Sequence, residues 1–201
     1  PNDIEPAVTP VDGAISSDCY VQGVNLASQK NYAMAISEFT RAIDLNPQHL
    51  DAYLGRAQVR FSVGDDRGTV EDCRRILSLK TDVVHAQYLL GRAYHRLGNV
   101  GSAIEEYSQA IVLVKDYAKA YYNRGLAHLE IKEQRSGVQD LKVASRLFRK
   151  QNNLSAYRRT RTTLAEISNL GGLNKDYSSF AFATLRAAFV LAPKILINPG
   201  T

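Results

Sequence analysis

The residues of this sequence that could bind a metal are few and widely spaced. Four histidines occur in the chain, and two of them, His85 and His95, are ten residues apart. On one helix that spacing places the side chains about 80° apart around the axis and about 15 Å apart along it, so the two imidazoles cannot bind one metal ion. The other two, His49 and His128, are more distant in sequence. The histidines therefore predict no metal site.

Patterns that would indicate an enzyme are also missing from the sequence. It contains no glycine-rich phosphate loop, no GxSxG, no HExxH and no CxxC. Its two cysteines, Cys19 and Cys73, are too few for a disulfide framework or a metal-ligand cluster, and we interpret them as small, half-buried residues. The acidic residues, such as Glu105 and Glu106, are interpreted as solvated charges on outward helix faces. We therefore expect no catalytic residue, no cofactor and no bound metal.

A run of positive charge is a candidate binding surface. Between Asp140 and Glu166 the sequence has no acidic residue but seven basic ones: Lys142, Arg146, Arg149, Lys150, Arg158, Arg159 and Arg161. Such a cluster can attract nucleic acid, an anionic membrane surface or an acidic protein. Nucleic acid is least favoured, because Tyr157 is the only tyrosine in the cluster that could stack on a base. We favour a solvated basic cap that steers an acidic partner.

The elements that would position these residues repeat along the chain. The stretch YAMAISEFTRAIDLNP (32–47) places Ala35, Phe39 and Ala42 on one face of a helix that ends before Pro47. A pattern of a small, then a bulky apolar, then a small or apolar residue recurs at a constant interval, at Thr69, Cys73 and Ile76, at Ala103, Tyr107 and Ala110, and at Gly137, Leu141 and Ala144. A second set of small residues has the same interval: Gly23, Ala57, Gly91 and Gly125. Because small residues on a buried face let another helix come close, each unit is predicted to be a packed helix pair that stacks on its neighbours.

The period of about 34 residues and the spacing of the small positions resemble those of the tetratricopeptide repeat. The segments AYYNRGLAHLEI (120–131) and AIEEYSQAIVL (103–113) carry the likeness most clearly. The third copy has the family's pattern at Leu90, Gly91, Tyr94, Ala103, Tyr107 and Ala110. The resemblance implies an all-α, right-handed superhelical solenoid of about four helix–turn–helix repeats plus a C-terminal capping helix. The repeats would be 16–49, 50–83, 84–117 and 118–151, with turns at 30–32, 64–66, 98–100 and 132–134.

The segments that flank the repeats have different sequences. Residues 152–170 are predicted to form the capping helix, with an apolar stripe at Leu154, Tyr157, Leu164 and Ile167. Residues 1–15 are expected to be an extended lead-in, and 171–201 an apolar tail whose helical part is too short to span a membrane. The tail could pack on the repeats, mediate self-association, or contact a membrane surface or a partner. Since the chain begins at Pro1, we expect a truncated or processed N-terminus; the compartment stays open, with a cytoplasmic location favoured.

In the tetratricopeptide repeat family the first helices line a concave face that binds ligands. The inward positions that the resemblance assigns to partner binding are Gln58, Phe61, Tyr88, Arg92, His95, Arg96, Lys119 and Tyr122. Arginine can pair bidentately with a carboxylate, and tyrosine supplies apolar area with a hydroxyl group. The sequence therefore predicts a non-enzymatic scaffold that binds a peptide or protein with acidic residues or a free carboxylate. The alternative is an adaptor that acts through the basic cap and the tail, in self-association or at a membrane.

One subset of the family holds the acidic C-terminal peptide of heat-shock chaperones in a two-carboxylate clamp. Its first repeat needs a lysine and an asparagine, but this sequence has Tyr20 and Val24 there. Gly55 replaces the asparagine of its second repeat, and Asn123 stands where the clamp has an arginine, although Lys119 fits in part. Recognition of that type is therefore not expected.

Overall fold

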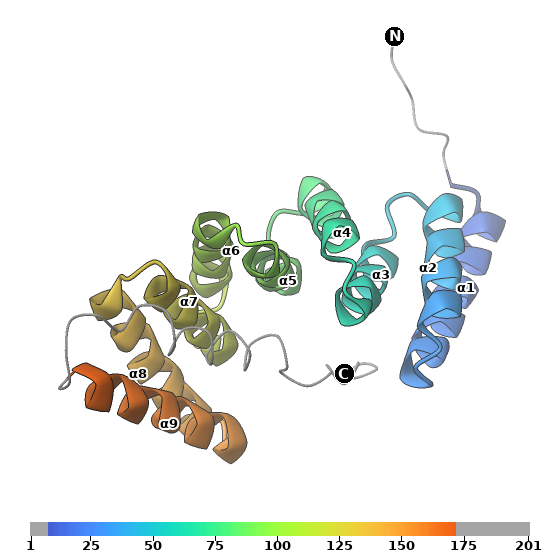
Figure 1. The fold of residues 1–201 in the computed structure, drawn as a ribbon. Helices are drawn as coiled ribbons and strands as arrows, with labels where there is room; N and C mark the ends of the chain where they lie inside the picture. Colours follow the sequence, from blue (N-terminus) through green and yellow to red (C-terminus); the bar gives the residue numbers. More distant parts are fainter. Residues whose placement is uncertain (1–7, 172–201) are drawn as a thin grey trace, which may run out of the picture. The chain divides into compact units, whose positions relative to one another are not determined.

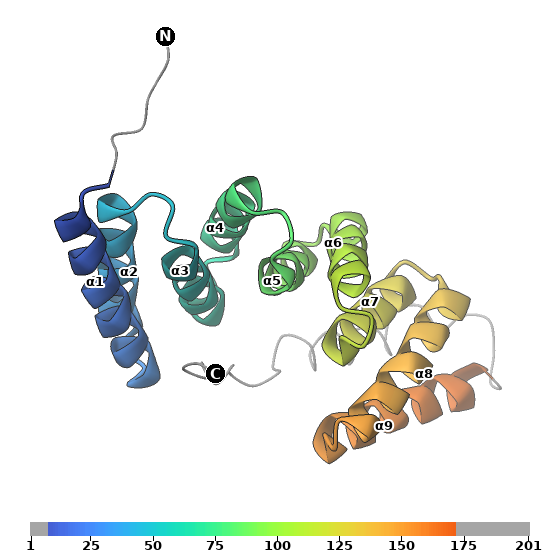
Figure 2. The same cartoon turned by 180° about the vertical axis from the view of Figure 1, so that it is seen from behind.

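The structure, a computed structural model, describes residues 8–171, and all of its regular secondary structure in that range is α-helical (Figures 1 and 2). The helices are α1 (Pro10–Ser28), α2 (Tyr32–Leu45), α3 (Leu50–Val63), α4 (Asp66–Leu79), α5 (Val84–Arg96), α6 (Val100–Leu113), α7 (Ala118–Glu130), α8 (Gln134–Lys150) and α9 (Leu154–Gly171). The predicted all-α class is confirmed for this range. The tail predicted at 171–201 lies outside the described residues, apart from its first residue.

Residues 8–89 and 90–171 fall into two compact units, and the boundary lies within α5. In the first unit α1 packs against α2, α2 against α3, and α3 against α4 (Figure 1). In the second unit α6 packs against α7, α7 against α8, and α8 against α9 (Figure 2). Helices that are consecutive in sequence are thus neighbours in space within each unit, as expected for stacked helix pairs.

Helix α1 begins at Pro10, six residues before the first predicted repeat. Pro10 suits the first turn of a helix, because that position has no intrahelical partner for its N–H. The Oγ1 atom of Thr9 accepts a hydrogen bond from the N–H of Asp12 at 3.1 Å and caps the helix. The last six residues of the expected lead-in are therefore helical.

The turns inside the helix pairs share one backbone conformation. Gly64 and Gly98 have φ values of 94° and 82°, in the left-handed region that glycine adopts without steric cost. Lys30 and Lys132 occupy the same position in the first and fourth pairs, with φ values of 64° and 65°. The interval between the four residues equals that of the small side chains, so the period is also a period of the backbone.

The small residues of the repeat lie where helices come into close contact. Ala35, Phe39 and Ala42 are fully buried. A Cβ atom added to Gly23 in α1 would lie 2.8 Å from the Phe39 ring, and one added to Gly55 in α3 would lie 2.7 Å from it. Phe39 therefore packs against both the preceding helix and the next first helix, which is the close approach that the spacing predicts.

In the second unit, glycine replaces alanine at one core position for a steric reason. A Cβ atom on Gly137 would lie 2.6 Å from Cγ of Leu129 and 2.8 Å from the backbone oxygen of Gly125. Leu129 therefore occupies the space that an alanine methyl group would need. The departure of the fourth repeat from the family pattern at this position thus has a packing explanation.

The capping helix packs on the last repeat with a partly different stripe from the predicted one. Leu164 and Ile167 pack against a core that includes Leu129, as expected. Leu154 was assigned to the same stripe, and this is wrong, because 55% of its surface is exposed. Thr160 is fully buried instead, and its hydroxyl group donates a hydrogen bond at 2.8 Å to the carbonyl of Ala156 one turn earlier. That internal bond satisfies the hydroxyl and makes the burial of a polar side chain possible.

Candidate protein-interaction surfaces

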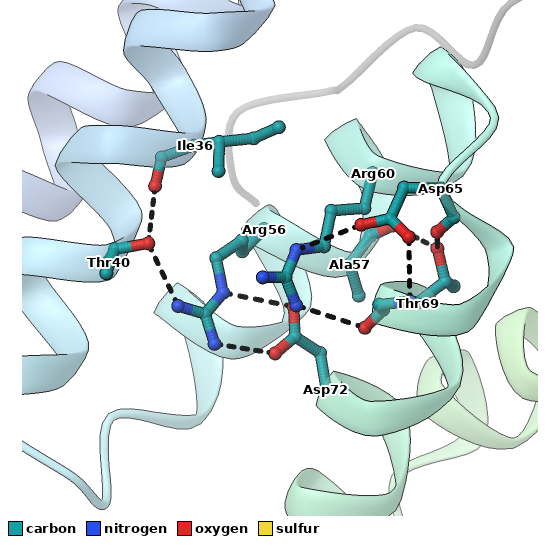
Figure 3. Close-up of polar contacts among 9 residues, drawn as sticks. Ile36, Thr40, Arg56, Ala57, Arg60, Asp65, Thr69 and Asp72 are labelled. Carbon is teal, nitrogen blue, oxygen red and sulfur yellow. Dashed lines mark hydrogen bonds and ion pairs between the residues drawn. The ribbon is translucent and has the colours of Figure 1, made fainter.

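A buried ion network joins three successive helices of the first unit (Figure 3). The guanidinium group of Arg56 in α3 donates to both carboxylate oxygens of Asp72 in α4, at 3.1 and 2.7 Å. Its third nitrogen donates to Oγ1 of Thr40 in α2 at 2.9 Å. The Thr40 hydroxyl in turn donates to the carbonyl of Ile36 at 2.8 Å. One arginine therefore ties the first helix of a repeat both to its own second helix and to the repeat before it.

A second arginine completes the network. Nη1 of Arg60 donates to Asp72 at 3.0 Å, and its Nε lies 3.5 Å from a carboxylate oxygen of Asp65 (Figure 3). The Asp72 side chain is only 2% exposed. A buried carboxylate is tolerated when it is paired and hydrogen-bonded, and Asp72 accepts three such bonds.

The same arrangement occurs two repeats later, in the second unit. Arg124 donates to both carboxylate oxygens of Asp140, at 2.7 and 2.9 Å, and to the hydroxyl of Ser108 at 2.9 Å. Ser108 donates to the carbonyl of Ile104 at 2.7 Å, as Thr40 does to the carbonyl one turn before it. The hydrogen bonds to Asp140 hold the pKa of Arg124 above its ordinary value.

The two networks differ at the position of the second cation. Where the first unit has Arg60 and Asp65, the second has His128 and Glu133, with Nδ1 of His128 2.6 Å from Oε2 of Glu133. The third repeat has Leu90 in the position of Arg56, so the arginine occurs in alternate repeats.

The two aspartates of these networks, Asp72 and Asp140, correct an expectation from the sequence. Acidic residues of second helices were interpreted as solvated charges, which is wrong for these two, because they are only 2% and 6% exposed. The signal that could have found them is an Arg–Asp pair at a spacing of 16 residues, which occurs as Arg56–Asp72 and again as Arg124–Asp140.

The first unit contains an aromatic cluster near the start of α3. The ring of Tyr20 lies 5.2 Å from that of His49 and 5.9 Å from that of Phe39. Burial raises the pKa of Tyr20, and the nearby negative charge of Asp51 raises it further. The structure thus brings Tyr20 and Asp51, from two first helices, close together.

The two partner-binding residues predicted on α3 differ in accessibility. Phe61 is only 5% exposed, and so contributes more to the core than to the surface. Gln58 is half-buried, and its backbone carbonyl accepts a hydrogen bond from Ser62 at 2.8 Å. Gln58 therefore offers the more accessible side chain of the two.

Four of the predicted binding residues lie on α5. Tyr88, Arg92 and Arg96 are half-buried and four residues apart, so they share one face of the helix. His95 is only 7% exposed, and its Nε2 lies 2.7 Å from Oε2 of Glu130 in α7. His95 thus already makes a contact between two helices of the second unit.

The last two predicted residues lie on α7, next to the capping helix. Lys119 is exposed. Tyr122 is half-buried, and its ring lies 6.3 Å from that of Phe148. Burial raises the pKa of Tyr122, while the charge of Arg159 and a hydrogen bond with Thr163, both in α9, act in the opposite direction. Helix α9 therefore lies against Tyr122 on the first helix of the fourth repeat.

All seven residues of the basic cluster are exposed. Four lie on the second half of α8 and three on the first half of α9, and these helices pack against each other across the turn at 151–153. The cations therefore gather at one end of the helix pair. This includes the six residues assigned to the basic cap: Arg146, Arg149, Lys150, Arg158, Arg159 and Arg161.

The described part of the chain contains neither a metal-binding cluster nor a helix that could span a membrane. No three His, Cys, Asp or Glu side chains within residues 8–171 lie close enough together to hold a metal ion. No helix in that range is long and apolar enough to cross a membrane.

Helix pairs at a constant stride, with small residues at their contacts, define a helical-repeat protein. Comparison with protein families identifies the repeat. A model described as "Tetratricopeptide repeat" matches residues 20–66, and one described as "TPR repeat" matches residues 79–131. The chain belongs to the tetratricopeptide repeat family.

Similar curated proteins are repeat proteins themselves. Human tetratricopeptide repeat protein 6 is 32% identical over 105 residues, which is 51% of this chain and 20% of that protein. Tetratricopeptide repeat protein 36 of Danio rerio is 39% identical over 62 residues, or 31% of this chain and 33% of that protein. The chain thus matches a third or less of these relatives.

Solved structures share the fold at low sequence identity. A crystal structure of MamA superposes with a TM-score of 0.67 at 17% identity, covering 92% of this chain and 99% of that one. The first repeat domain of Spaghetti (RPAP3), bound to the HSP90 peptide SRMEEVD, gives 0.59 at 18% identity, covering 60% and 95%. At these identities the likeness shows the fold.

Proposed function

We propose that this chain is a non-enzymatic interaction scaffold that binds a peptide or protein segment on the inner faces of its first helices. The observation that carries the proposal is a set of basic side chains on first helices of the second unit. Arg92 and Arg96 share one face of α5, and Lys119 is exposed on α7. The family and the neighbouring structures support a binding role of this kind.

The chemistry of these side chains favours an acidic partner. A half-buried guanidinium group is partly shielded from water, which strengthens its bidentate hydrogen bonds to a carboxylate. Tyr88 lies one turn from Arg92 on the same face, and adds apolar area and a hydroxyl group. We therefore propose a segment with acidic residues or a free C-terminal carboxylate.

The peptide of the RPAP3 complex is a useful comparison. Because Tyr20, Val24, Gly55 and Asn123 replace clamp residues, we propose that this chain does not select SRMEEVD. The aromatic cluster of Tyr20 and His49 fills that part of the first unit instead. SRMEEVD therefore serves as a discriminating probe rather than as the expected ligand.

The test starts from a library of short random peptides with free C-termini, selected on the wild-type chain. Dissociation constants for the enriched peptides are then measured by fluorescence anisotropy. The variant Arg92→Glu/Arg96→Glu should bind them at least about tenfold more weakly, because each charge-assisted hydrogen bond contributes about 1.5–3 kcal/mol. The control Arg67→Glu/Arg135→Glu has the same change in net charge at two exposed residues of second helices and should bind as wild type.

Circular dichroism verifies that all variants remain helical. Enrichment of peptides without acidic residues, or equal binding by the Arg92/Arg96 variant and the control, would refute the proposed site. Tighter binding of SRMEEVD than of the enriched peptides would show that the clamp comparison is wrong.

A further inference from the structure

The basic cluster on α8 and α9 forms no ion pair among the described residues. None of its seven side chains forms an ion pair with an acidic group in residues 8–171, whereas Arg56, Arg60 and Arg124 all do. Asp140 is the nearest acidic residue in the sequence on the α8 side, and it is buried against Arg124. The seven cations are therefore not held in ion pairs by the described part of the fold.

Packing of the helix pair does not need these charges. The contact between α8 and the helices beside it uses Ala144 and Phe148 from α8, and Ala156 and Tyr157 from α9. The cations lie on the remaining, exposed positions of both helices. A solvated face would usually mix both signs, but this one carries basic residues alone over twenty positions of the sequence.

An apolar side chain is exposed in the middle of the cluster. Leu154 begins α9 at the tip of the helix pair, between Lys150 and Arg158, and 55% of its surface is accessible. Exposed leucine among arginines and lysines is the composition of segments that bind at the surface of an anionic bilayer. The loop beside the tip is neutral overall, because Lys115 precedes Asp116, whose carbonyl accepts a hydrogen bond from Gln151 at 2.9 Å.

Two other partners fit the cluster less well. Single-stranded nucleic acid needs aromatic rings on which bases stack, but Tyr157 is half-buried and packs in the core beside Phe148. An acidic peptide on two helices would need side-chain pockets for specificity, but apart from the exposed Leu154 the apolar residues that this pair contributes to the clusters pack in its core.

We propose that the α8–α9 tip, with its seven cations and Leu154, binds an anionic phospholipid surface. Attraction between the cations and the lipid headgroups would bring the tip to the bilayer, and Leu154 would enter the boundary between headgroups and acyl chains. Binding should therefore need acidic lipid and weaken as salt screens the charges. This proposal is independent of the peptide-binding one, which uses the inner faces of first helices.

The experiment measures flotation of the full chain with vesicles of phosphatidylcholine, with and without phosphatidylserine. Wild type should float with the phosphatidylserine vesicles alone, and less at high salt. The variant Arg146→Gln/Arg149→Gln/Arg158→Gln should lose roughly a hundredfold in partitioning, because each basic residue contributes about a factor of five. The control Arg67→Gln/Lys132→Gln/Arg135→Gln, with the same charge change at exposed residues elsewhere, should bind as wild type.

Further variants and probes keep the test decisive. Leu154→Ser should weaken binding without changing its salt dependence, and circular dichroism verifies folding. Binding to both vesicle types alike, or equal loss in the control variant, would overturn the proposal. The proposal would also be overturned if the chain did not float with either kind of vesicle but bound fluorescent oligothymidine or polyglutamate through the same three arginines.

Discussion

Removal of the Asp72 carboxylate should destabilise the first unit strongly. This side chain is 2% exposed and accepts three hydrogen bonds from Arg56 and Arg60. In Asp72→Ala, the two guanidinium groups would keep their charge and lose the carboxylate that balances it. Breaking a buried ion pair from one side costs about 3–5 kcal/mol. Because the arginine side chains are 12% and 20% exposed, water can partly solvate them, and we expect the lower end, about 3 kcal/mol.

The effect is measured by denaturant unfolding, which gives the free energy, and by thermal unfolding, which gives the midpoint temperature, both followed by far-ultraviolet circular dichroism. A loss of about 3 kcal/mol corresponds to a fall in midpoint temperature of roughly 6–12 °C for a chain of this size. The matched control is Asp44→Ala, which removes an exposed aspartate from α2 and should change the free energy of unfolding by less than about 0.5 kcal/mol.

A double variant separates charge from packing. In Arg56→Met/Asp72→Leu the bidentate pair is replaced by apolar side chains, and Arg60 keeps Asp65 as a partner at 3.5 Å. Since a buried ion pair often stabilises no more than apolar residues of similar volume, the double variant should recover most of the lost stability. If Asp72→Ala and the control Asp44→Ala have the same free energy of unfolding, or if the double variant is no more stable than Asp72→Ala, the reasoning is wrong.

Three further predictions concern packing and protonation. Ala103→Leu should lose about 1–3 kcal/mol of stability, because Ala103 is fully buried. Ala33→Leu, at an exposed position of α2, should not be destabilised in this way. Equal midpoint temperatures for the two variants would contradict the close packing. Gly23→Ala should destabilise the protein, since the added Cβ atom would lie 2.8 Å from the Phe39 ring. Gly101→Ala should instead stabilise it by up to about 1 kcal/mol, because its Cβ atom meets nothing within 4 Å. Thermal unfolding of both variants tests the two predictions. The raised pKa of Tyr122 contributes stability that is present below about pH 10 and is lost as the pH rises through the folded-state pKa. Tyr122→Phe should therefore reduce the fall in midpoint temperature at alkaline pH. An unchanged pH dependence of the midpoint temperature in this variant would contradict the prediction.

The repeat could be predicted from the sequence because its constraint depends on residue size alone. Phe39 fits against α1 only because Gly23 has no side chain, and the same size limit recurs at Ala57, Gly91 and Gly125 in the other copies. The same holds for the left-handed turn, where Gly64 and Gly98 mark the conformation. Periodic size therefore predicted the helix pairs, their turns and their core.

The ion networks were missed because charge alone does not reveal a partner. The same position of the other second helices holds Glu38, Glu106 and Asp140, so the residue type does not single out Asp72, which is buried where Arg56 on the preceding helix reaches it. That requirement couples two positions of one repeat to Thr40 of the repeat before. The Arg–Asp pair does not recur at one repeat length, because Leu90 replaces the arginine in the third copy. It recurs only at two repeat lengths, as Arg56–Asp72 and Arg124–Asp140.

The capping helix shows why a hydrophobic stripe predicts burial only when the neighbours are known. Helix α9 contacts α8, and its orientation buries Thr160 and Thr163 while it leaves Leu154 exposed. A threonine can replace an apolar residue there because each hydroxyl bonds to the carbonyl one turn earlier, at 2.8 Å for Thr160 and 3.1 Å for Thr163. The fold thus needs neither Leu154 nor the arginines beside it for packing. Packing does not explain the types of these residues, and they share one end of a helix pair. They are therefore the ones to test for binding.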